Sequence, residues 1–166
     1  MTTWIVNASP LILLGKINRL ELLAALAPSF VIPAAVRSEI LAGPDLDPAK
    51  AWIKSAYGSA HVMPEAPIPT EILAWDLGAG ETAVLALAST RTSSVCVLDD
   101  LAARNCAAVF QIPVIGTLGI LLKAKVGGFI PRLKPEIEIL LTVGSLLSPS
   151  LIQQALTLAG EPLGPI

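Results

Sequence analysis

Apolar and polar residues alternate along the chain in blocks that predict short strands and helices in turn. Residues 4–6, 30–32 and 95–98 are continuous apolar runs, too short to be helices. Strands of this kind are typical of a parallel sheet that is covered on both faces. Two further short strands are predicted over residues 60–63 and 112–115.

Helical patterns follow the predicted strands. Ser9 and Pro10 favour a helix start, as N-cap and first helical residue, before the apolar residues 11–26. Pro33 precedes a helix predicted over residues 34–41. Further helices are predicted over residues 47–56, 99–110, 117–125, 135–143 and 151–159, and one follows the glycines that precede Glu81. This alternation indicates a three-layer α/β/α sandwich with a mainly parallel sheet.

The length of 166 residues is typical of one domain. We therefore expect residues 1–166 to form a single domain. Residues 44–70 contain several prolines and are expected to be a variable connector, and residues 145–166 are expected to form a C-terminal helical tail.

The composition is apolar for a soluble protein, with 54% hydrophobic and 14% charged residues. Such a chain is expected to bury apolar surface on both faces of a sheet, in a dimer interface or against a partner. The best candidate for a membrane span, residues 107–122, is interrupted by Gln111 and Pro113 and is shorter than the roughly 20 residues needed. The first residues lack the basic start of a signal peptide, so we expect a cytoplasmic protein without a membrane segment.

Cysteine and histidine offer little chemistry. Cys96 and Cys106 are ten residues apart and form no CxxC pair, so they are interpreted as small buried hydrophobic residues. His61 is the only histidine, which excludes histidine-rich metal sites and disfavours a Ser-His-Asp triad. Polar chemistry in this chain would therefore depend on carboxylates.

The net charge of −2 argues against a molecule that binds nucleic acid by its overall charge. One segment is locally basic and contains no acid, and it includes Lys123, Lys125, Arg132 and Lys134. This segment could contact phosphate or be an ordinary solvated helix end.

The few polar residues fall mainly where predicted strands end. Ligands of parallel sheets bind at that edge. Adjacent carboxylates repel each other unless a cation or a proton lies between them. Oxygen ligands from several segments would suit Mg²⁺ or Mn²⁺, which can activate water for phosphodiester hydrolysis without histidine. The residues expected at this edge are Asn7, Ser9, Glu39, Glu81, Asp99, Asp100 and Thr117.

Each of these residues also has an ordinary explanation. Asp99 or Asp100 can cap the following helix, and Asp100 with Arg104 is a routine i,i+4 ion pair. The position that they share at one edge is what favours a functional site. A local role in capping or stabilising a helix could also explain each of the remaining residues on its own. These residues are Ser9, Glu39, Glu81 and Thr117.

Five segments in order resemble a known family. They are IVNASPLILLGKINRLELL, VIPAAVRSEI, DLGAGETAVLALA, VLDDLAARNCA and IPVIGTLGILLKAKVGGFIP. Over about residues 4–160 the chain resembles the PIN-like nucleases, in the branch close to the toxins of toxin–antitoxin pairs. The resemblance implies a five-stranded parallel sheet, an acidic pocket for Mg²⁺ or Mn²⁺, and metal-dependent cleavage of RNA. It also implies a homodimer and a small antitoxin protein as partner.

The resemblance assigns roles to individual residues. The first-strand carboxylate position falls on Asn7, the helix glutamate on Glu39 and the third acidic position on Glu81. The fourth falls on Asp99 or Asp100. Ser9 and Thr117 match small hydroxyl positions near the pocket. Apart from the resemblance, we expect Arg104 and the basic segment with Lys123 and Lys125 to contact RNA phosphates.

Asn7 departs from the family pattern. An amide oxygen can bind a hard cation, but it brings no negative charge, so metal binding should be weaker than with a carboxylate. Two interpretations follow. The chain is a nuclease with weak activity or altered metal preference, or it is a catalytically degenerate PIN-like protein that binds a protein or nucleic acid.

Overall fold

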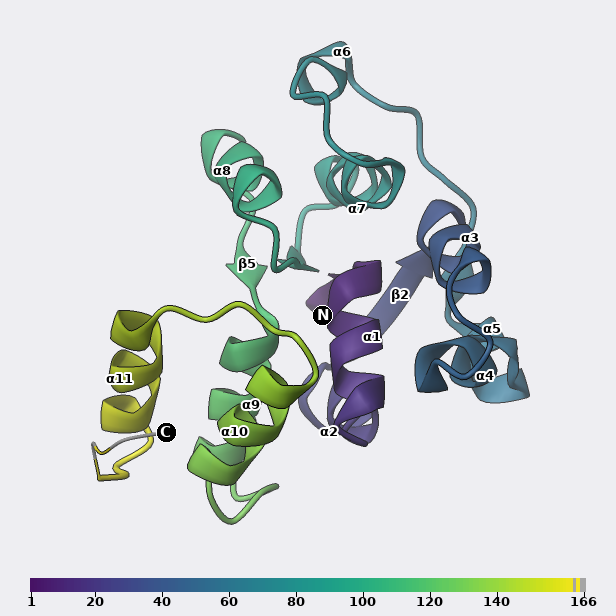
Figure 1. The fold of residues 1–166 in the computed structure, drawn as a ribbon. Helices are drawn as coiled ribbons and strands as arrows, with labels where there is room; N and C mark the ends of the chain where they lie inside the picture. Colours follow the sequence, from purple (N-terminus) through teal and green to yellow (C-terminus); the bar gives the residue numbers. More distant parts are fainter. Residues whose placement is uncertain (163, 165–166) are drawn as a thin grey trace.

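A parallel sheet forms the centre of the molecule (Figure 1). The computed structural model describes residues 1–162 and 164, and within them the sheet has five strands in the order β3-β2-β1-β4-β5. Every pairing is parallel. The predicted α/β/α sandwich is therefore confirmed. The strands are β1 (Thr3–Val6), β2 (Ser29–Pro33), β3 (Val62–Met63), β4 (Ser94–Val97) and β5 (Val114–Ile115).

Strand β1 lies at the point where the strand order reverses, between β2 and β4. Trp4 pairs with Phe30 of β2, and Val6 pairs with Val97 of β4. The backbone N–H of Asn7 still donates to the carbonyl of Val97, at 3.1 Å. The crevice at such a reversal is where open parallel sheets bind ligands.

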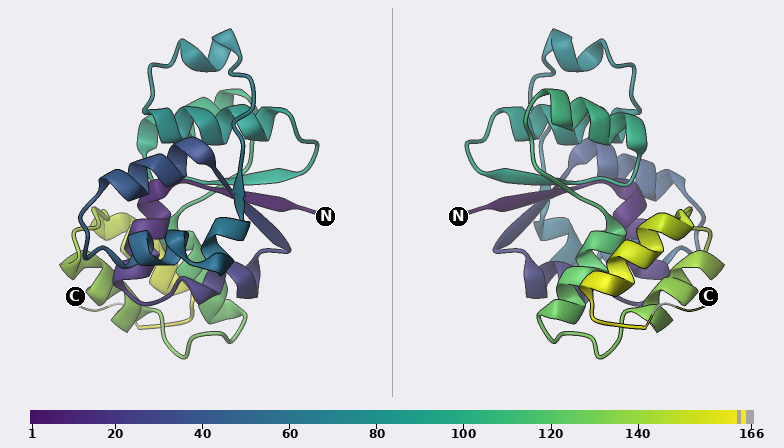
Figure 2. Two further views of the ribbon diagram at one scale, coloured as in Figure 1. Left: turned by 90° about the vertical axis from the view of Figure 1, so that its right-hand side faces the viewer. Right: turned by 90° about the vertical axis from the view of Figure 1, so that its left-hand side faces the viewer.

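Helices cover both faces of the sheet (Figures 1 and 2). One face carries α7 (Ala79–Ser89) and α8 (Leu101–Val109), with α6 (Thr70–Leu73) beyond them. The other face carries α1 (Ala8–Lys16), α2 (Glu21–Leu26), α9 (Thr117–Val126), α10 (Lys134–Thr142) and α11 (Pro149–Leu158). The remaining helices are α3 (Ala34–Ala42), which packs against both α7 and α1, then α4 (Pro48–Lys54) and α5 (Ala56–Ala60).

The helix predicted over residues 11–26 is two helices. The chain breaks between α1 and α2 at Asn18, whose φ is +59°, a left-handed conformation that asparagine tolerates. The prediction of Ser9 as N-cap was also wrong, because Asn7 occupies that position and Ser9 is exposed in the first turn. Pro10 fits there because the first amide groups of a helix have no partner within it.

Two short helices lie where no helix was expected. The α5 segment begins at Ser55, whose hydroxyl accepts from the N–H of Gly58 at 3.1 Å. The α6 segment follows the proline-rich stretch. Helices of four or five residues are too short to show a helical repeat of apolar residues.

The cysteines are buried and free, in line with their interpretation as hydrophobic residues. Burial raises the pKa of the Cys96 thiol to about 12, so it stays protonated at neutral pH. Among the described residues, no helix has both the length and the apolar character needed to cross a bilayer.

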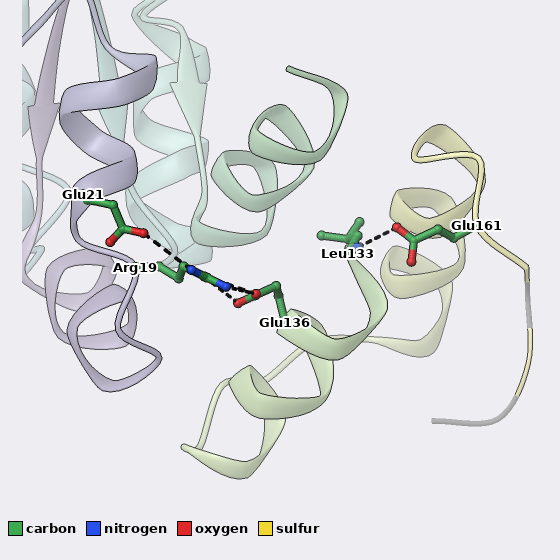
Figure 3. Close-up of polar contacts among 5 residues, drawn as sticks. All are labelled: Arg19, Glu21, Leu133, Glu136 and Glu161. Carbon is green, nitrogen blue, oxygen red and sulfur yellow. Dashed lines mark hydrogen bonds and ion pairs between the residues drawn. The ribbon is translucent and has the colours of Figure 1, made fainter. Parts of the chain in front are cut away.

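An ion pair with a buried carboxylate connects α10 to the turn between α1 and α2 (Figure 3). Arg19 donates to Glu136 through Nη2 at 2.6 Å and through Nε at 3.2 Å. Glu136 is only 6% exposed. The hydrogen bond that Arg19 donates to Glu136 raises the pKa of the guanidinium, with Glu21 a smaller contributor. The pair therefore holds α10 against the segment between α1 and α2.

A second carboxylate fixes the start of the same helix (Figure 3). Glu161 accepts from the backbone N–H groups of Leu133, at 2.5 Å, and Lys134, at 3.0 Å. Burial alone would raise the pKa of Glu161, but these two N–H groups and nearby cations lower it overall. The chain after α11 is thereby held against the start of α10.

Replacing Arg19 with methionine should destabilise the fold, because it leaves the Glu136 carboxylate buried without its cation. We expect the free energy of unfolding, measured with urea, to fall by about 2–3 kcal/mol. The matched control is Asp45→Ala, which removes a surface pair, since the Asp45 side chain is 94% exposed beside Lys50. That control should change stability little, and an equal loss in both variants would contradict the role of the buried pair.

Candidate functional site

Three segments meet through polar contacts at the carboxyl edge of the sheet. Asn7 directly follows β1, Glu39 lies on α3, and Glu81 lies in the first turn of α7. The Asn7 side-chain amide donates through Nδ2 to Glu81 Oε1, at 3.1 Å. The backbone N–H of Gly80 donates to Glu39 Oε1, at 2.7 Å. The structure therefore brings together three of the predicted site residues.

The orientation of the Asn7 amide follows from its neighbour. An ionised carboxylate can only accept hydrogen bonds, so the NH₂ group must face Glu81 and the carbonyl oxygen must face away. Asn7 is 1% exposed, and its Oδ1 has no hydrogen-bond partner in the part of the chain that the structure describes. Buried polar atoms without a partner are rare, and an ordered water molecule or a bound ion at this edge of the sheet would satisfy this oxygen.

Gly80 allows two oxygens of the site to approach its backbone closely. A Cβ built on Gly80 would lie 2.7 Å from Glu39 Oε2 and 2.9 Å from Asn7 Oδ1. Both oxygens therefore lie close to the backbone of residue 80, where a side chain would overlap them. Gly78 likewise leaves room for the carboxylate of Glu81, which a side chain at residue 78 would overlap. Space, rather than an unusual backbone angle, is what requires glycine at residue 80.

The start of α7 favours negative charge at this point. Backbone N–H groups at a helix N-terminus carry a partial positive charge that stabilises nearby anions. Glu39 receives one of these N–H groups directly, and Glu81 lies within the first turn. Sequence reasoning named both glutamates but not Gly80, for which the G-A-G-E pattern is the available signal.

Asp99 and Asp100 each hold the start of a helix. Asp99 Oδ1 accepts from the backbone N–H of Thr117 at 2.8 Å, and Oδ2 accepts from the Thr117 hydroxyl at 2.6 Å. Asp100 Oδ2 accepts from the N–H of Ala103 at 2.9 Å and caps α8. Thr117 is buried, whereas Asp100 is exposed. Asp99, which follows β4, thus connects that strand to the start of α9. Asp100 caps α8, the helix that directly follows it.

Arg104 lies beside Asp99. Its Nη1 donates to the carbonyl of Leu98 at 3.2 Å. A Cβ on Gly116 would lie 2.7 Å from that nitrogen and 3.0 Å from Asp99 Oδ1, so the two groups flank the same glycine. Among the described residues, no ion pair joins Arg104 to Asp100, so the expected i,i+4 pair is replaced by this arrangement.

The predicted lysines lie away from the carboxylates. Lys123 and Lys125 are in the last turn of α9, whose first residue is Thr117. At a rise of 1.5 Å per residue, Lys123 is roughly 9 Å from Thr117 along the helix. Lys125 donates to the carbonyl of Pro131 at 3.0 Å. Ser9 is exposed on α1.

The donor atoms of the site fit a hard divalent cation. Within residues 1–162 and 164, no three His, Cys, Asp or Glu side chains gather as a metal cluster. Glu39 and Glu81 supply two acids near Asn7, and an acid at residue 7 would be the third. Asn7 occupies that position with a neutral amide. Carboxylate and amide oxygens are nevertheless the ligands that Mg²⁺ and Mn²⁺ take, and such ions need few protein ligands because they keep water.

A separate cavity lies at the opposite, amino-terminal edge of the sheet. It has a volume of about 540 Å³, and its lining includes Thr2, Ser93 and Phe110. None of the carboxylates described above lines it. It is therefore distinct from the carboxyl-edge site.

Comparison with known proteins identifies the fold family. No curated protein sequence matches the chain. A family model described as PIN domain matches residues 3–161, nearly the whole chain. PIN domains have a nuclease-type fold, generally use divalent metal ions and generally bind nucleic acid. The match and the five-stranded parallel sheet agree, and the chain belongs to the PIN-domain family.

Proposed function

We propose that this protein is a metal-dependent ribonuclease that hydrolyses RNA phosphodiester bonds and acts as the toxin-like component of a toxin–antitoxin pair. One observation carries the proposal. The buried Asn7 carbonyl oxygen has no hydrogen-bond partner among the described residues and lies, with Glu39 Oε2, close to the backbone of Gly80.

Glu39 and Asn7 would hold Mg²⁺ or Mn²⁺, and Glu81, Asp99 and Asp100 remain the further expected ligands. A bound divalent cation would supply an activated water molecule and would stabilise the charge on the leaving oxygen. The chain supplies the rest. Glu81 uses Oε1 to accept from Asn7, which leaves Oε2 to take a proton from the attacking water as a general base.

Arg104 is the candidate phosphate contact. Its side chain is exposed, and it lies beside Asp99 at the same edge of the sheet. Only one of its nitrogens donates to Leu98. Guanidinium groups have five N–H donors and bind phosphate through pairs of them, so donors remain for an RNA backbone. Lys123, Lys125, Ser9 and Thr117 remain predictions for substrate contact, with Thr117 acting through Asp99.

The homodimer and the antitoxin are part of the same proposal. Large apolar side chains are exposed on two helices that both contact α7, with Leu73 on α6 and Leu101 and Val109 on α8 all more than half exposed. Exposed apolar residues that gather in a patch mark protein interfaces. These helices are therefore candidate contact surfaces.

A second candidate function has its own supporting observation. The replacement of a carboxylate by Asn7, and the lack of a three-acid cluster among the described residues, favour a binding module that has lost catalysis. Such a protein would bind RNA without cutting it. Cleavage assays separate the two candidates directly.

The ribonuclease proposal predicts RNA cleavage that requires Mn²⁺ or Mg²⁺ and stops in EDTA. Glu39→Gln removes a charged ligand and should lower the cleavage rate at least about 100-fold, because metal catalysis contributes several kcal/mol. The rate is measured on a fluorescently labelled single-stranded RNA.

The control for that experiment is Glu138→Gln, the same substitution at an exposed residue of α10. It should leave the rate unchanged. Cleavage that persists in EDTA, or that Glu39→Gln does not reduce, would contradict the proposal. Binding of the RNA without cleavage would favour the binding module.

The structure also predicts that Gly80→Ala blocks the cation site. The new methyl group would lie within 3 Å of Glu39 Oε2 and Asn7 Oδ1, so these side chains would have to move away from the positions in which they could share a cation. Isothermal titration calorimetry should show Mn²⁺ affinity reduced at least about tenfold, while helix content is kept because alanine favours helices.

Gly164→Ala is the matched control. A methyl group there would make only an ordinary contact, 3.8 Å from Lys134 Nζ. Its Mn²⁺ affinity should equal that of the unchanged protein. Equal affinity in Gly80→Ala would show that the space at Gly80 is not the binding site.

A further inference from the structure

We propose that Asn7 is a positioning residue that holds the cation site in its binding arrangement before any cation is present. This inference rests on the proposed function, in which the site binds a divalent cation. It gives a physical reason for the amide that replaces a carboxylate at this position.

The contact between Asn7 and Glu81 is the first observation. Asn7 Nδ2 and Glu81 Oε1 are 3.1 Å apart and form a hydrogen bond. Two carboxylates at this distance would repel each other unless a cation or a proton lay between them. The amide replaces that repulsion with an attraction, so Glu81 needs no cation to stay in place.

The opposite end of the same side chain is the second observation. Glu81 fixes the NH₂ group on one side, which turns Oδ1 toward Glu39 Oε2 and Gly80. Because Asn7 is 1% exposed, bulk water does not satisfy this oxygen. One side chain therefore secures Glu81 and directs a candidate ligand oxygen toward Glu39 and Gly80.

Glu39 is held independently of Asn7. Its Oε1 accepts from the backbone N–H of Gly80, a group that no side-chain substitution removes. A change at residue 7 should therefore act mainly on Glu81 and on the ligand oxygen. The expected consequence is a preformed site with one negative charge fewer, which binds its cation less tightly than a site built from carboxylates alone.

The test compares three proteins: the unchanged chain, Asn7→Asp, and the double variant Asn7→Asp/Glu81→Gln. The double variant exchanges the amide and the carboxylate and keeps one hydrogen bond and the same net charge. Melting temperature is measured in EDTA and in saturating MnCl₂, and Mn²⁺ affinity is measured by calorimetry. No activity measurement is needed.

In EDTA, we expect Asn7→Asp to have a lower melting temperature than the unchanged chain. Mn²⁺ should raise its melting temperature by more, and its Mn²⁺ affinity should be at least about tenfold higher, because the substitution adds a negative charge. The double variant should recover the melting temperature in EDTA, because the amide introduced at residue 81 donates to the carboxylate introduced at residue 7. If Asn7→Asp does not fold, folding of the double variant supports the proposal.

Two results would overturn it. One is a melting temperature of Asn7→Asp in EDTA equal to that of the unchanged chain. The other is a double variant that is as unstable as Asn7→Asp, or that does not fold. Absence of Mn²⁺ binding in all three proteins would refute the proposed function alone, because the comparison in EDTA tests the role of Asn7 without metal.

Discussion

The site depends on backbone N–H groups at the starts of helices, which hold carboxylates at one edge of the sheet. Gly80 of α7 donates to Glu39, and Thr117 of α9 donates to Asp99. Asp100 caps α8 in the same way. Each helix begins close to the end of a strand, so three positive helix ends face this edge. They stabilise a concentration of negative charge that an apolar domain could not otherwise tolerate.

Asn7 lies at the centre of this arrangement and reduces its charge. In the metal-free protein, a neutral hydrogen bond to Glu81 replaces a repulsion. Compared with a carboxylate at residue 7, the amide also removes one negative charge that would attract a cation. Such a balance suits a site that is ordered at all times and binds its metal with moderate affinity. The apolar core beneath, with β1 almost fully buried, keeps the amide away from water.

Much of this could be predicted from sequence, because apolar runs report strands and the ends of parallel strands share one edge. That reasoning placed Asn7, Glu39 and Glu81 together. It could not assign Asp99 to α9, because its partner Thr117 is eighteen residues away and capping patterns are local. It also could not place the break at Asn18, where a backbone angle interrupts an apolar pattern that continues. The packing of Glu39 and Asn7 against Gly80 joins three separate segments, so the G-A-G-E pattern alone does not reveal it.

The central claim is that Asn7 Oδ1 and Glu39 Oε2 share one cation. The most direct measurement is anomalous X-ray diffraction from crystals soaked in MnCl₂, with data collected at the manganese edge. The account predicts a peak beside Gly80 that contacts both oxygens. Absence of a peak there, or manganese bound only at Asp99 and Asp100, would contradict it.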